Sequence, residues 1–255
     1  MKKLLKLTFS FLVLFFLAFY LYLYLHHATP ILMYHSFDKK RVEDYAAVSL
    51  EKFYRQMEFI KKSKYNVASL SYYCKLLKDK KPIPRNLIVI TIDDGYKDNL
   101  PAFKILKQFN FPATVFLITN EIGNPGFLSK EEIISSLKND EIGIGSHTNT
   151  HPDLSKLSDK ELKEELTGSK SALGKMFNQN IETLAYPGGA FNEKVLKDAD
   201  DSGYLCACAT NRGFSRSLNR FALRRIKVTD NDNDFTLWAK LSGYYNIFKK
   251  IKKPY

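Results

Sequence analysis

The sequence has little cysteine, and this limits the covalent and metal chemistry that thiols could provide. It contains three cysteines, Cys74, Cys206 and Cys208, so at least one thiol is left without a partner. Cys206 and Cys208 lie two residues apart in a predicted strand at 204–210, where their side chains point the same way and would pair only with distortion. No neighbouring histidine or cysteine completes a Cys-x-Cys metal site. We therefore expect buried strand thiols.

The chain also lacks internal repeats, low-complexity segments beyond its apolar amino terminus, and the basic and aromatic motifs of nucleic-acid readers. Its 39 Lys and Arg against 27 Asp and Glu give a net charge of +12, spread over predicted helices and both termini. Without a recognisable reader motif, nucleic acid is not expected as a partner. Attraction to anionic lipid headgroups or to an acidic polymer fits the charge as well.

The amino terminus contains a long apolar run at residues 7–25, preceded by Lys2, Lys3 and Lys6. A run of this length without charges is typical of a transmembrane helix, and the flanking lysines favour a cytoplasmic amino end. We therefore predict a membrane anchor, or an uncleaved signal, at residues 1–28. One further domain would occupy residues 29–255, outside the cytoplasm, on a single-pass protein of the cytoplasmic membrane.

Helical and strand patterns alternate through the rest of the chain. Repeated alternation of this kind predicts an α/β fold with a parallel barrel. The predicted strands are 30–35, 87–92, 113–118, 142–146, 183–186, 204–210 and 223–228, and the predicted helices are 50–64, 70–78, 100–109, 130–138, 158–177, 192–201 and 235–248.

The segment at 87–96, LIVITIDDGY, places two acids at the end of an apolar, β-branched run. Such a run suits a strand buried on both faces, and Gly95 permits a sharp turn after it. Ligands of α/β folds bind at the carboxyl ends of parallel strands, where Asp93 and Asp94 would lie. Adjacent residues of an extended segment face opposite sides, so the two acids can have different roles. A solvated Asp-Gly turn is the alternative.

A second polar segment, SHTNTHPDL at 146–154, follows the strand predicted at 142–146. It carries His147 and His151, four residues apart, and Pro152 favours a loop over a helix there. Two imidazoles and the carboxylate of Asp94 would form a facial set of ligands for a divalent cation, with positions left open for water and substrate. Two unrelated surface histidines are the alternative.

The motifs TIDDG and SHTNTHPDL resemble the first two motifs of the polysaccharide deacetylases, the NodB-homology domains of carbohydrate esterase family 4. The resemblance covers most of the chain after Pro30 and implies a distorted (β/α)7-type barrel. It also implies that Asp94, His147 and His151 bind the metal and that Asp93 is the general base. Zn²⁺ is the first expectation for this ligand set, and Co²⁺, Ni²⁺ and Fe²⁺ are compatible with it.

His35 is our candidate for the general acid. The resembled family usually has its acid histidine in a carboxy-terminal motif, but no histidine follows Arg225. The segment PILMYHSF resembles instead the first strand of the poly-N-acetylglucosamine deacetylases, whose motif order is circularly permuted. In a closed barrel the first and last strands are neighbours, so His35 would reach the same place. The alternative is that His35 only packs beneath the site.

The segment LAYPGGAF at 184–191 resembles the third family motif but departs from it. Ala185 stands near the expected arginine, and Gly188 replaces a tyrosine. Gly188 and Tyr186 are candidates for oxyanion and substrate binding, because a backbone N–H needs no side chain for that role. Arg225 or Arg224 would replace the missing arginine and orient the base. A structural salt bridge is the alternative for both.

The resemblance, together with these residues, implies a metal-dependent hydrolase of linear amides that removes acetyl groups from an extracytoplasmic polysaccharide containing N-acetylglucosamine. A divalent metal lowers the pKa of bound water, and paired acids and bases move the protons. The irregular third motif leaves a second hypothesis, a catalytically weak carbohydrate-binding relative. A third hypothesis keeps the deacetylase but changes the substrate to peptidoglycan or O-acetyl esters.

Overall fold

The computed structural model describes residues 2–25, 27–38, 47–138, 141–210 and 219–245. Its strands form one sheet in the order β8-β7-β6-β5-β4-β3-β1-β9, with β2 paired to β3. Every pairing between these strands is parallel. The strands are β1 (Ile31–Tyr34), β2 (Asn66–Ala68), β3 (Leu87–Ile92), β4 (Ala113–Leu117), β5 (Ile142–Ser146), β6 (Thr183–Ala185), β7 (Cys206–Ala209), β8 (Leu223–Arg224) and β9 (Ile226–Lys227).

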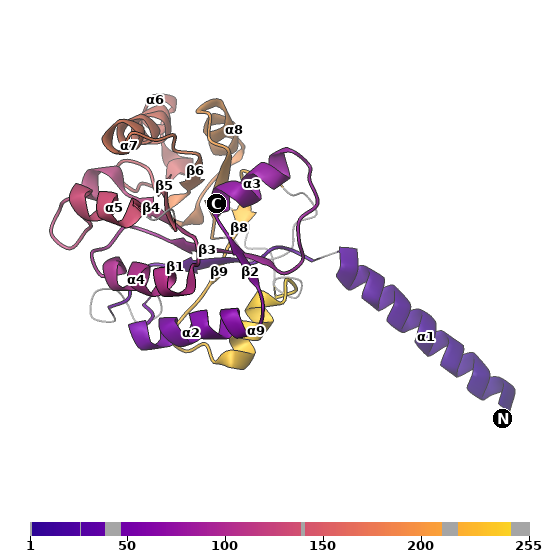
Figure 1. Ribbon diagram of the computed structural model, residues 1–255. Coiled ribbons are helices and arrows are strands. Elements are labelled where there is room, and N and C mark those ends of the chain that lie inside the picture. The colour runs from indigo at the N-terminus through magenta and orange to yellow at the C-terminus, as the bar shows by residue number, and fades with distance from the viewer. Residues whose placement is uncertain (1, 26, 39–46, 139–140, 211–218, 246–255) are drawn as a thin grey trace.

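Helices connect these strands and lie around the sheet, as Figure 1 shows. Several begin at a serine or asparagine whose side chain accepts a hydrogen bond from the first turn, as at Ser49 and Asn192. The α-helices are α1 (Lys2–Leu25), α2 (Leu50–Lys62), α3 (Leu70–Lys78), α4 (Asn99–Phe109), α5 (Lys130–Leu137), α6 (Asp159–Lys163), α7 (Ser169–Phe177), α8 (Glu193–Asp201) and α9 (Asp234–Leu241). Single turns occur at η1 (Thr119–Glu121), η2 (Leu154–Lys156), η3 (Glu164–Gly168) and η4 (Pro187–Gly189).

The sheet is nearly closed by the segment 223–227. Strands β8 and β9 lie at the two ends of the strand order, yet only Arg225 separates them in sequence. The predicted strand at 223–228 is therefore two short strands, one paired to β7 and one to β1. This nearly closed parallel barrel agrees with the predicted α/β barrel architecture, while the predicted strands did not include β2.

The predicted helices at 158–177 and 235–248 differ in detail from the structure. The first is continuous but contains a π-helical turn, η3, between α6 and α7. The second ends at Leu241, and residues 246–248 of the prediction lie outside the described part of the chain.

Strand β3 divides its side chains between two apolar clusters. Ile88, Ile90 and Ile92 belong to the larger cluster, which includes residues of the surrounding helices, whereas Leu87 and Val89 belong to a smaller cluster drawn mainly from other strands. Alternation along a strand places these sets on opposite faces. The smaller cluster therefore fills the inside of the barrel, and all six residues of β3 are buried, as its continuous apolar run predicts.

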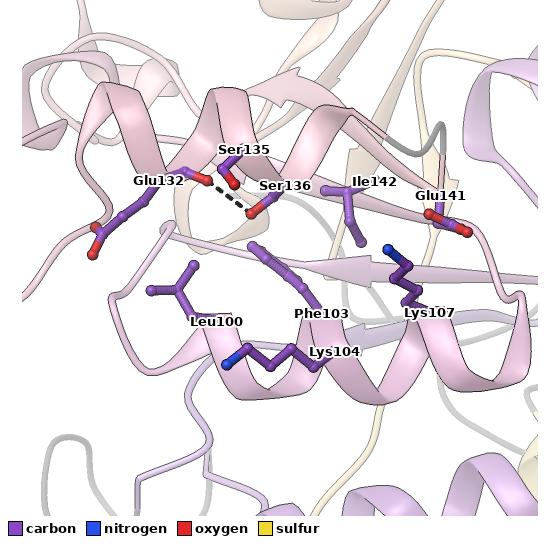
Figure 2. A pocket seen from close by; sticks show the side chains of 9 residues that line it. All are labelled: Leu100, Phe103, Lys104, Lys107, Glu132, Ser135, Ser136, Glu141 and Ile142. Carbon is purple, nitrogen blue, oxygen red and sulfur yellow. Dashed lines mark hydrogen bonds between the residues drawn. The ribbon is translucent and has the colours of Figure 1, made fainter.

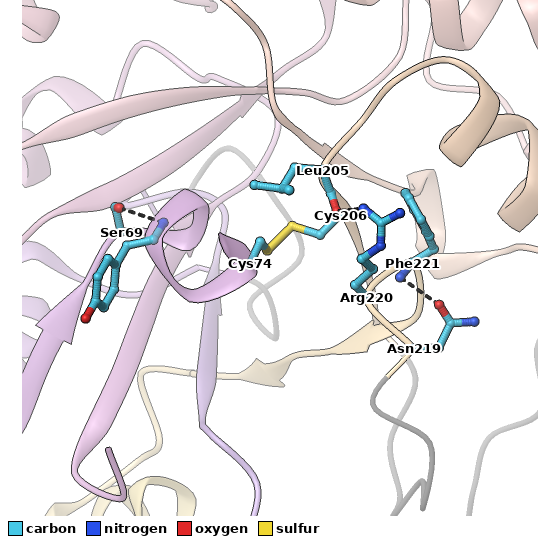
Figure 3. The surroundings of a disulfide bond; sticks show 8 residues. Ser69, Cys74, Leu205, Cys206, Asn219, Arg220 and Phe221 are labelled. Carbon is cyan, nitrogen blue, oxygen red and sulfur yellow. Dashed lines mark hydrogen bonds between the residues drawn. A yellow bond between two sulfur atoms is a disulfide. The ribbon is translucent and has the colours of Figure 1, made fainter. Parts of the chain in front are cut away.

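Helix α3 contributes Leu70, Tyr73 and Cys74 to the inner cluster, and a disulfide bond ties it to the sheet. Cys74 of α3 is bonded to Cys206 of β7 (Figure 3), whereas Cys208 is free and buried. Our expectation of buried strand thiols was therefore wrong for Cys206. The pairing depends on the position of α3 against β7, which the local pattern of the sequence does not indicate.

Helix α1 extends away from the barrel in Figure 1, and Arg85 donates a hydrogen bond of 2.7 Å to the carbonyl of Tyr24 near its end. Within the described chain, no helix has both the length and the apolar character needed to cross a membrane. A spanning helix needs about 20 consecutive apolar residues. The predicted transmembrane helix, membrane anchoring and single-pass location were therefore wrong.

Candidate metal centre

Strand β3 ends directly before the two acids of the TIDDG motif. The backbone N–H of Asp93 still donates to the carbonyl of Tyr34 on β1, at 2.9 Å. The chain then turns through left-handed backbone angles, with φ of 72° at Asp94 and 73° at Gly95. A Cβ at Gly95 would lie 2.6 Å from the side chain of Leu117, so only glycine fits this turn without a shift.

Strand β5 places His147 beside the end of β6. The Nδ1 atom of His147 lies 2.8 Å from the carbonyl oxygen of Ala185, which can only accept, so Nδ1 carries the proton in this contact. The Nε2 atom is then free to bind a cation. The Ala185 carbonyl was not among the predicted site groups, although the neighbouring positions of β5 and β6 would indicate it once the strand order is known. A carbonyl holding the second ring nitrogen is usual for metal-binding histidines.

The structure brings together the three side chains predicted as metal ligands. The Nε2 atoms of His147 and His151 lie 3.5 and 3.8 Å from Oδ1 of Asp94. All three potential ligand atoms lie within 4.8 Å of one another. Two atoms that each bind one ion at ~2.1 Å lie at most ~4.2 Å apart, so the two distances to Asp94 suit a shared ion. The residues present therefore fit a divalent cation.

The two histidines differ in how they are placed. His147 is almost fully buried, whereas 40 % of the His151 side chain is exposed, so the cluster opens on the His151 side. Burial, and then the charge of His147, lower the pKa of His151. A lowered pKa favours the neutral imidazole, which is the form that binds a metal.

Asp93 is buried and paired with Arg225. The guanidinium donates two bonds to the carboxylate, from Nη1 to Oδ1 at 2.5 Å and from Nη2 to Oδ2 at 2.7 Å. Burial alone would raise the pKa of Asp93, but the charges of Arg225, His35 and His147 lower it to about 2. Asp93 is therefore ionised at neutral pH. Of the two arginines predicted as orienting residues, Arg225 makes this contact, whereas the side chain of Arg224 is half-buried.

His35 follows strand β1 and faces the same carboxylate. Its Nε2 atom lies 3.7 Å from Oδ2 of Asp93, and 22 % of its side chain is exposed. Burial lowers the pKa of His35, and the charge of Asp93 acts against this. The backbone of His35 is held by Asn99, whose Nδ2 donates to the His35 carbonyl at 2.8 Å. Its Nδ1 is buried without a partner among the described residues.

The two candidate residues of the third motif, Gly188 and Tyr186, differ in their exposure to solvent. Gly188 is exposed three residues after Ala185, with φ of 60° and open space where a Cβ would lie. Tyr186 is fully buried, and its hydroxyl donates to the carbonyl of Phe221 at 2.9 Å. This geometry does not favour the predicted contact between the Tyr186 side chain and substrate. It leaves Gly188 as the candidate in this motif.

A groove elsewhere on the molecule does not involve these residues. Figure 2 shows that it lies between α4 and α5, with Leu100, Phe103 and Ile142 beside charged side chains such as Lys104 and Glu132. Its volume is about 360 Å³, and none of the predicted site residues lines it. The predicted catalytic and metal-binding residues lie instead after the carboxyl ends of β1, β3 and β5, as expected for a parallel barrel.

Comparison of the chain with protein families identifies the family to which it belongs. The family model described as polysaccharide deacetylase matches residues 80–207. This match spans half of the chain and includes Asp93, Asp94, His147 and His151. The chain belongs to the polysaccharide deacetylase family. The resemblance stated for the two motifs is confirmed, and the protein is an enzyme of the hydrolase class. His35 and Arg225 lie outside the matched range.

Individual relatives agree with this assignment. This polysaccharide deacetylase is 33 % identical over 203 residues to YxkH of Bacillus subtilis, whose name places it in the same family; the match covers 78 % of this chain and 71 % of that protein. It is 29 % identical to the poly-beta-1,6-N-acetyl-D-glucosamine N-deacetylase of Staphylococcus epidermidis, covering 80 % and 75 % of the two chains. Its structure is similar to that of the Streptococcus pyogenes deacetylase PplD in complex with acetate, with a TM-score of 0.77, 27 % identity, and 84 % and 97 % coverage.

Proposed function

We propose that this polysaccharide deacetylase hydrolyses the N-acetyl groups of a polysaccharide containing N-acetylglucosamine and releases acetate. The proposal depends on a divalent cation held by Asp94, His147 and His151. The observation that carries it is the convergence of these three side chains next to the ionised, arginine-bound Asp93. The Staphylococcus epidermidis relative, which is named for this sugar, supports the choice of substrate.

The ligand set suits Zn²⁺ first, with Co²⁺, Ni²⁺ and Fe²⁺ as compatible ions. When bound, such an ion lowers the pKa of a coordinated water towards ~7 and withdraws charge from a carbonyl oxygen. His147 is fixed for this role because Ala185 holds its other ring nitrogen. His151 supplies the ligand on the exposed side, where a polymer can approach.

Asp93 is the proposed general base. Its carboxylate is ionised because Arg225 lowers its pKa, and the two parallel bonds from the guanidinium fix its orientation. A base of this kind accepts a proton from the attacking water. Arg225 is therefore the proposed base-orienting residue, in the role that an arginine of the third motif would have had.

His35 is the proposed general acid for the leaving nitrogen. Its Nε2 lies 3.7 Å from the carboxylate of Asp93, so acid and base face one reaction centre. The exposed Gly188, on the segment after β6, is the proposed donor to the oxyanion through its backbone N–H. The disulfide bond between Cys74 and Cys206 supports a polysaccharide met outside the cytoplasm, since disulfides persist in oxidising compartments.

The test is acetate release from N-acetylglucosamine oligomers by protein stripped with a chelator and then given Zn²⁺. We expect no acetate from the stripped protein, recovery with Zn²⁺, and loss of release in Asp94→Ala and His147→Ala. Asp201→Ala is the matched control, because Asp201 is an exposed acid of α8 paired to Lys197. Full activity in either ligand variant would refute the proposed site.

The same assay separates the alternatives. A carbohydrate-binding relative would retain affinity for the oligomers and release no acetate with any of the four ions. A peptidoglycan or O-acetyl ester deacetylase would release acetate from those substrates and not from N-acetylglucosamine oligomers. The pairing of Arg225 with Asp93 favours catalysis over binding alone, because it gives the proposed base an arginine partner in place of the arginine that the third motif lacks.

A further inference from the structure

The loop that carries His151 has an unusual backbone. Thr148 and His151 both adopt left-handed conformations, with φ of 69° and 62°. This region is sparsely populated for residues other than glycine and is a genuine outlier for a β-branched residue such as Thr148. Such a loop keeps its shape only when surrounding groups hold it. The position of His151 therefore depends on contacts made by residues 148–151.

Glu165 makes most of the side-chain contacts to this loop. Its Oε2 atom accepts from the backbone N–H groups of Asn149 and Thr150, at 2.7 and 3.0 Å. Its Oε1 atom accepts from the Thr150 hydroxyl at 2.6 Å. One carboxylate thus satisfies two consecutive backbone donors and one side chain immediately before His151. Bonds to an ionised acceptor are stronger than neutral ones.

Glu165 lies in a π-helical turn beside this loop. This turn, η3, interrupts the helix formed by α6 and α7. A single π turn inside an α-helix is uncommon and is frequent at functional sites. The turn also approaches the loop closely, since a Cβ at Gly168 would lie 2.9 Å from Nδ2 of Asn149, and that amide donates to the carbonyl of Glu164 at 2.7 Å. The Ser169 hydroxyl donates to the Glu165 carbonyl at 2.6 Å.

We infer that Glu165 is a positioning residue for the metal centre, which holds the loop 148–151 so that His151 faces Asp94. The inference rests on the proposed function, because it assigns a role to Glu165 through a proposed metal ligand. Glu165 does not itself belong to the ligand cluster. Its loss should therefore affect the side of the site formed by His151 and leave Asp94 and His147 in place.

The chain offers a rescue variant and a matched control for a test by metal affinity. In Glu165→Gln the amide oxygen still accepts from both backbone N–H groups, and the amide nitrogen can donate to the hydroxyl of Thr150. Glu165→Ala removes all three bonds. Glu164→Ala removes a neighbouring exposed carboxylate of the same turn and leaves the Glu164 carbonyl in place.

The affinity of the full-length protein for Zn²⁺ is measured by competition with a chromogenic chelator, and the visible spectrum of bound Co²⁺ reports the ligand set. We expect Glu165→Ala to weaken Zn²⁺ binding by about tenfold or more and to change the Co²⁺ spectrum, with Glu165→Gln within about threefold of wild type. Glu164→Ala should match the wild type in both measurements. Thr150→Val, which removes one bond of three, should give an intermediate affinity.

Each other outcome is decisive. Wild-type protein that binds neither ion would refute the proposed metal site and this inference with it. Wild-type affinity in folded Glu165→Ala, or an equal loss in Glu164→Ala, would refute only the role of Glu165. If Glu165→Ala does not fold, Glu165→Gln and Thr150→Val test the role of Glu165 in its place. An unchanged Zn²⁺ affinity in Thr150→Val together with a large loss of affinity in Glu165→Gln would contradict the three hydrogen bonds described for Glu165.

Discussion

Arg225 and Asp93 form a buried, bidentate ion pair at the point where the barrel closes. Arg225 separates β8 from β9, the two ends of the sheet, and its guanidinium bonds both carboxylate oxygens of Asp93 at the end of β3. The same side chain lies 3.2 Å from the Thr91 hydroxyl and 3.4 Å from the Ala209 carbonyl. One residue therefore links closure of the sheet to the orientation of the proposed base.

Replacing Arg225 by lysine should therefore damage activity more than stability. A lysine keeps the charge but cannot make two parallel bonds, so Asp93 would be held less firmly. We expect kcat for acetate release to fall about 100-fold, the size of effect that a small misplacement of a catalytic group produces. Arg224→Lys, at the half-buried neighbouring position, should change kcat much less. Equal losses in the two variants would contradict the assignment of Arg225.

Arg225→Ala should also destabilise the fold, because it leaves the carboxylate of Asp93 buried without a cation. Removing one partner of a buried ion pair costs about 3–5 kcal/mol. Urea unfolding of the metal-free protein, compared with that of Arg224→Ala, measures this cost. A free energy of unfolding equal to that of the wild type would mean that water or another cation replaces the guanidinium.

The low pKa of Asp93 predicts loss of stability in acid. The folded pKa is about 2, whereas an unfolded aspartate titrates near ~3.9. Because the folded pKa is the lower one, the contribution is fully present above about pH 5 and is lost as the pH falls towards 2, for a total of about 2–3 kcal/mol. Urea unfolding of metal-free protein between pH 2 and 5 should show this slope, and Asp93→Asn should flatten it. Asp201→Asn, which changes an exposed acid, should keep the wild-type slope.

The parts of the fold that follow from local patterns were predictable. The continuous apolar run of β3 predicted burial on both faces, and the helix predicted from residue 158 begins there as α6, where Ser158 and Glu161 form a capping box. Parallel strands end at one edge of the sheet, so acids after β3 and histidines after β5 were expected to lie close together, which the structure shows. Their chemical roles stay predictions.

The rest depended on contacts that no local pattern reveals. Arg224 and Arg225 are equivalent as sequence, and only the register of β8 and β9 against the barrel decides which one faces inward. Tyr186 was expected to contact substrate because of its place in a motif, but its ring is buried against the core. The π turn that presents Glu165 lies in a segment whose pattern is that of an ordinary helix.

His35→Gln should lower kcat while leaving metal affinity unchanged. His35 faces Asp93 and is not one of the three clustered ligands, so its loss removes proton transfer and not the metal site. General acid catalysis contributes about 10²–10⁴-fold, and the loss in kcat should fall in this range. His27→Gln is the control, because His27 precedes β1 and lies at the opposite end of that strand, against Tyr244. Weaker Zn²⁺ binding in His35→Gln would instead indicate a ligand role.

The disulfide bond predicts a stability difference that depends on reduction. Cys74 and Cys206 are 132 residues apart in sequence, so their bond constrains a long loop of the unfolded chain and should contribute about 2–4 kcal/mol. We expect dithiothreitol to lower the melting temperature of the wild type and of Cys208→Ala. It should have no effect on the double variant Cys74→Ala/Cys206→Ala, which should melt near the reduced wild type.

Thiol titration checks the same pairing directly. Under non-reducing conditions the unfolded protein should show a single reactive thiol, from Cys208. The folded protein should show none, because Cys208 is fully buried and this burial raises the pKa of its thiol to about 12, which suppresses the reactive thiolate. Three reactive thiols after unfolding would mean that the bond between α3 and β7 does not form. The inner cluster would then hold α3 against the strands by apolar packing alone.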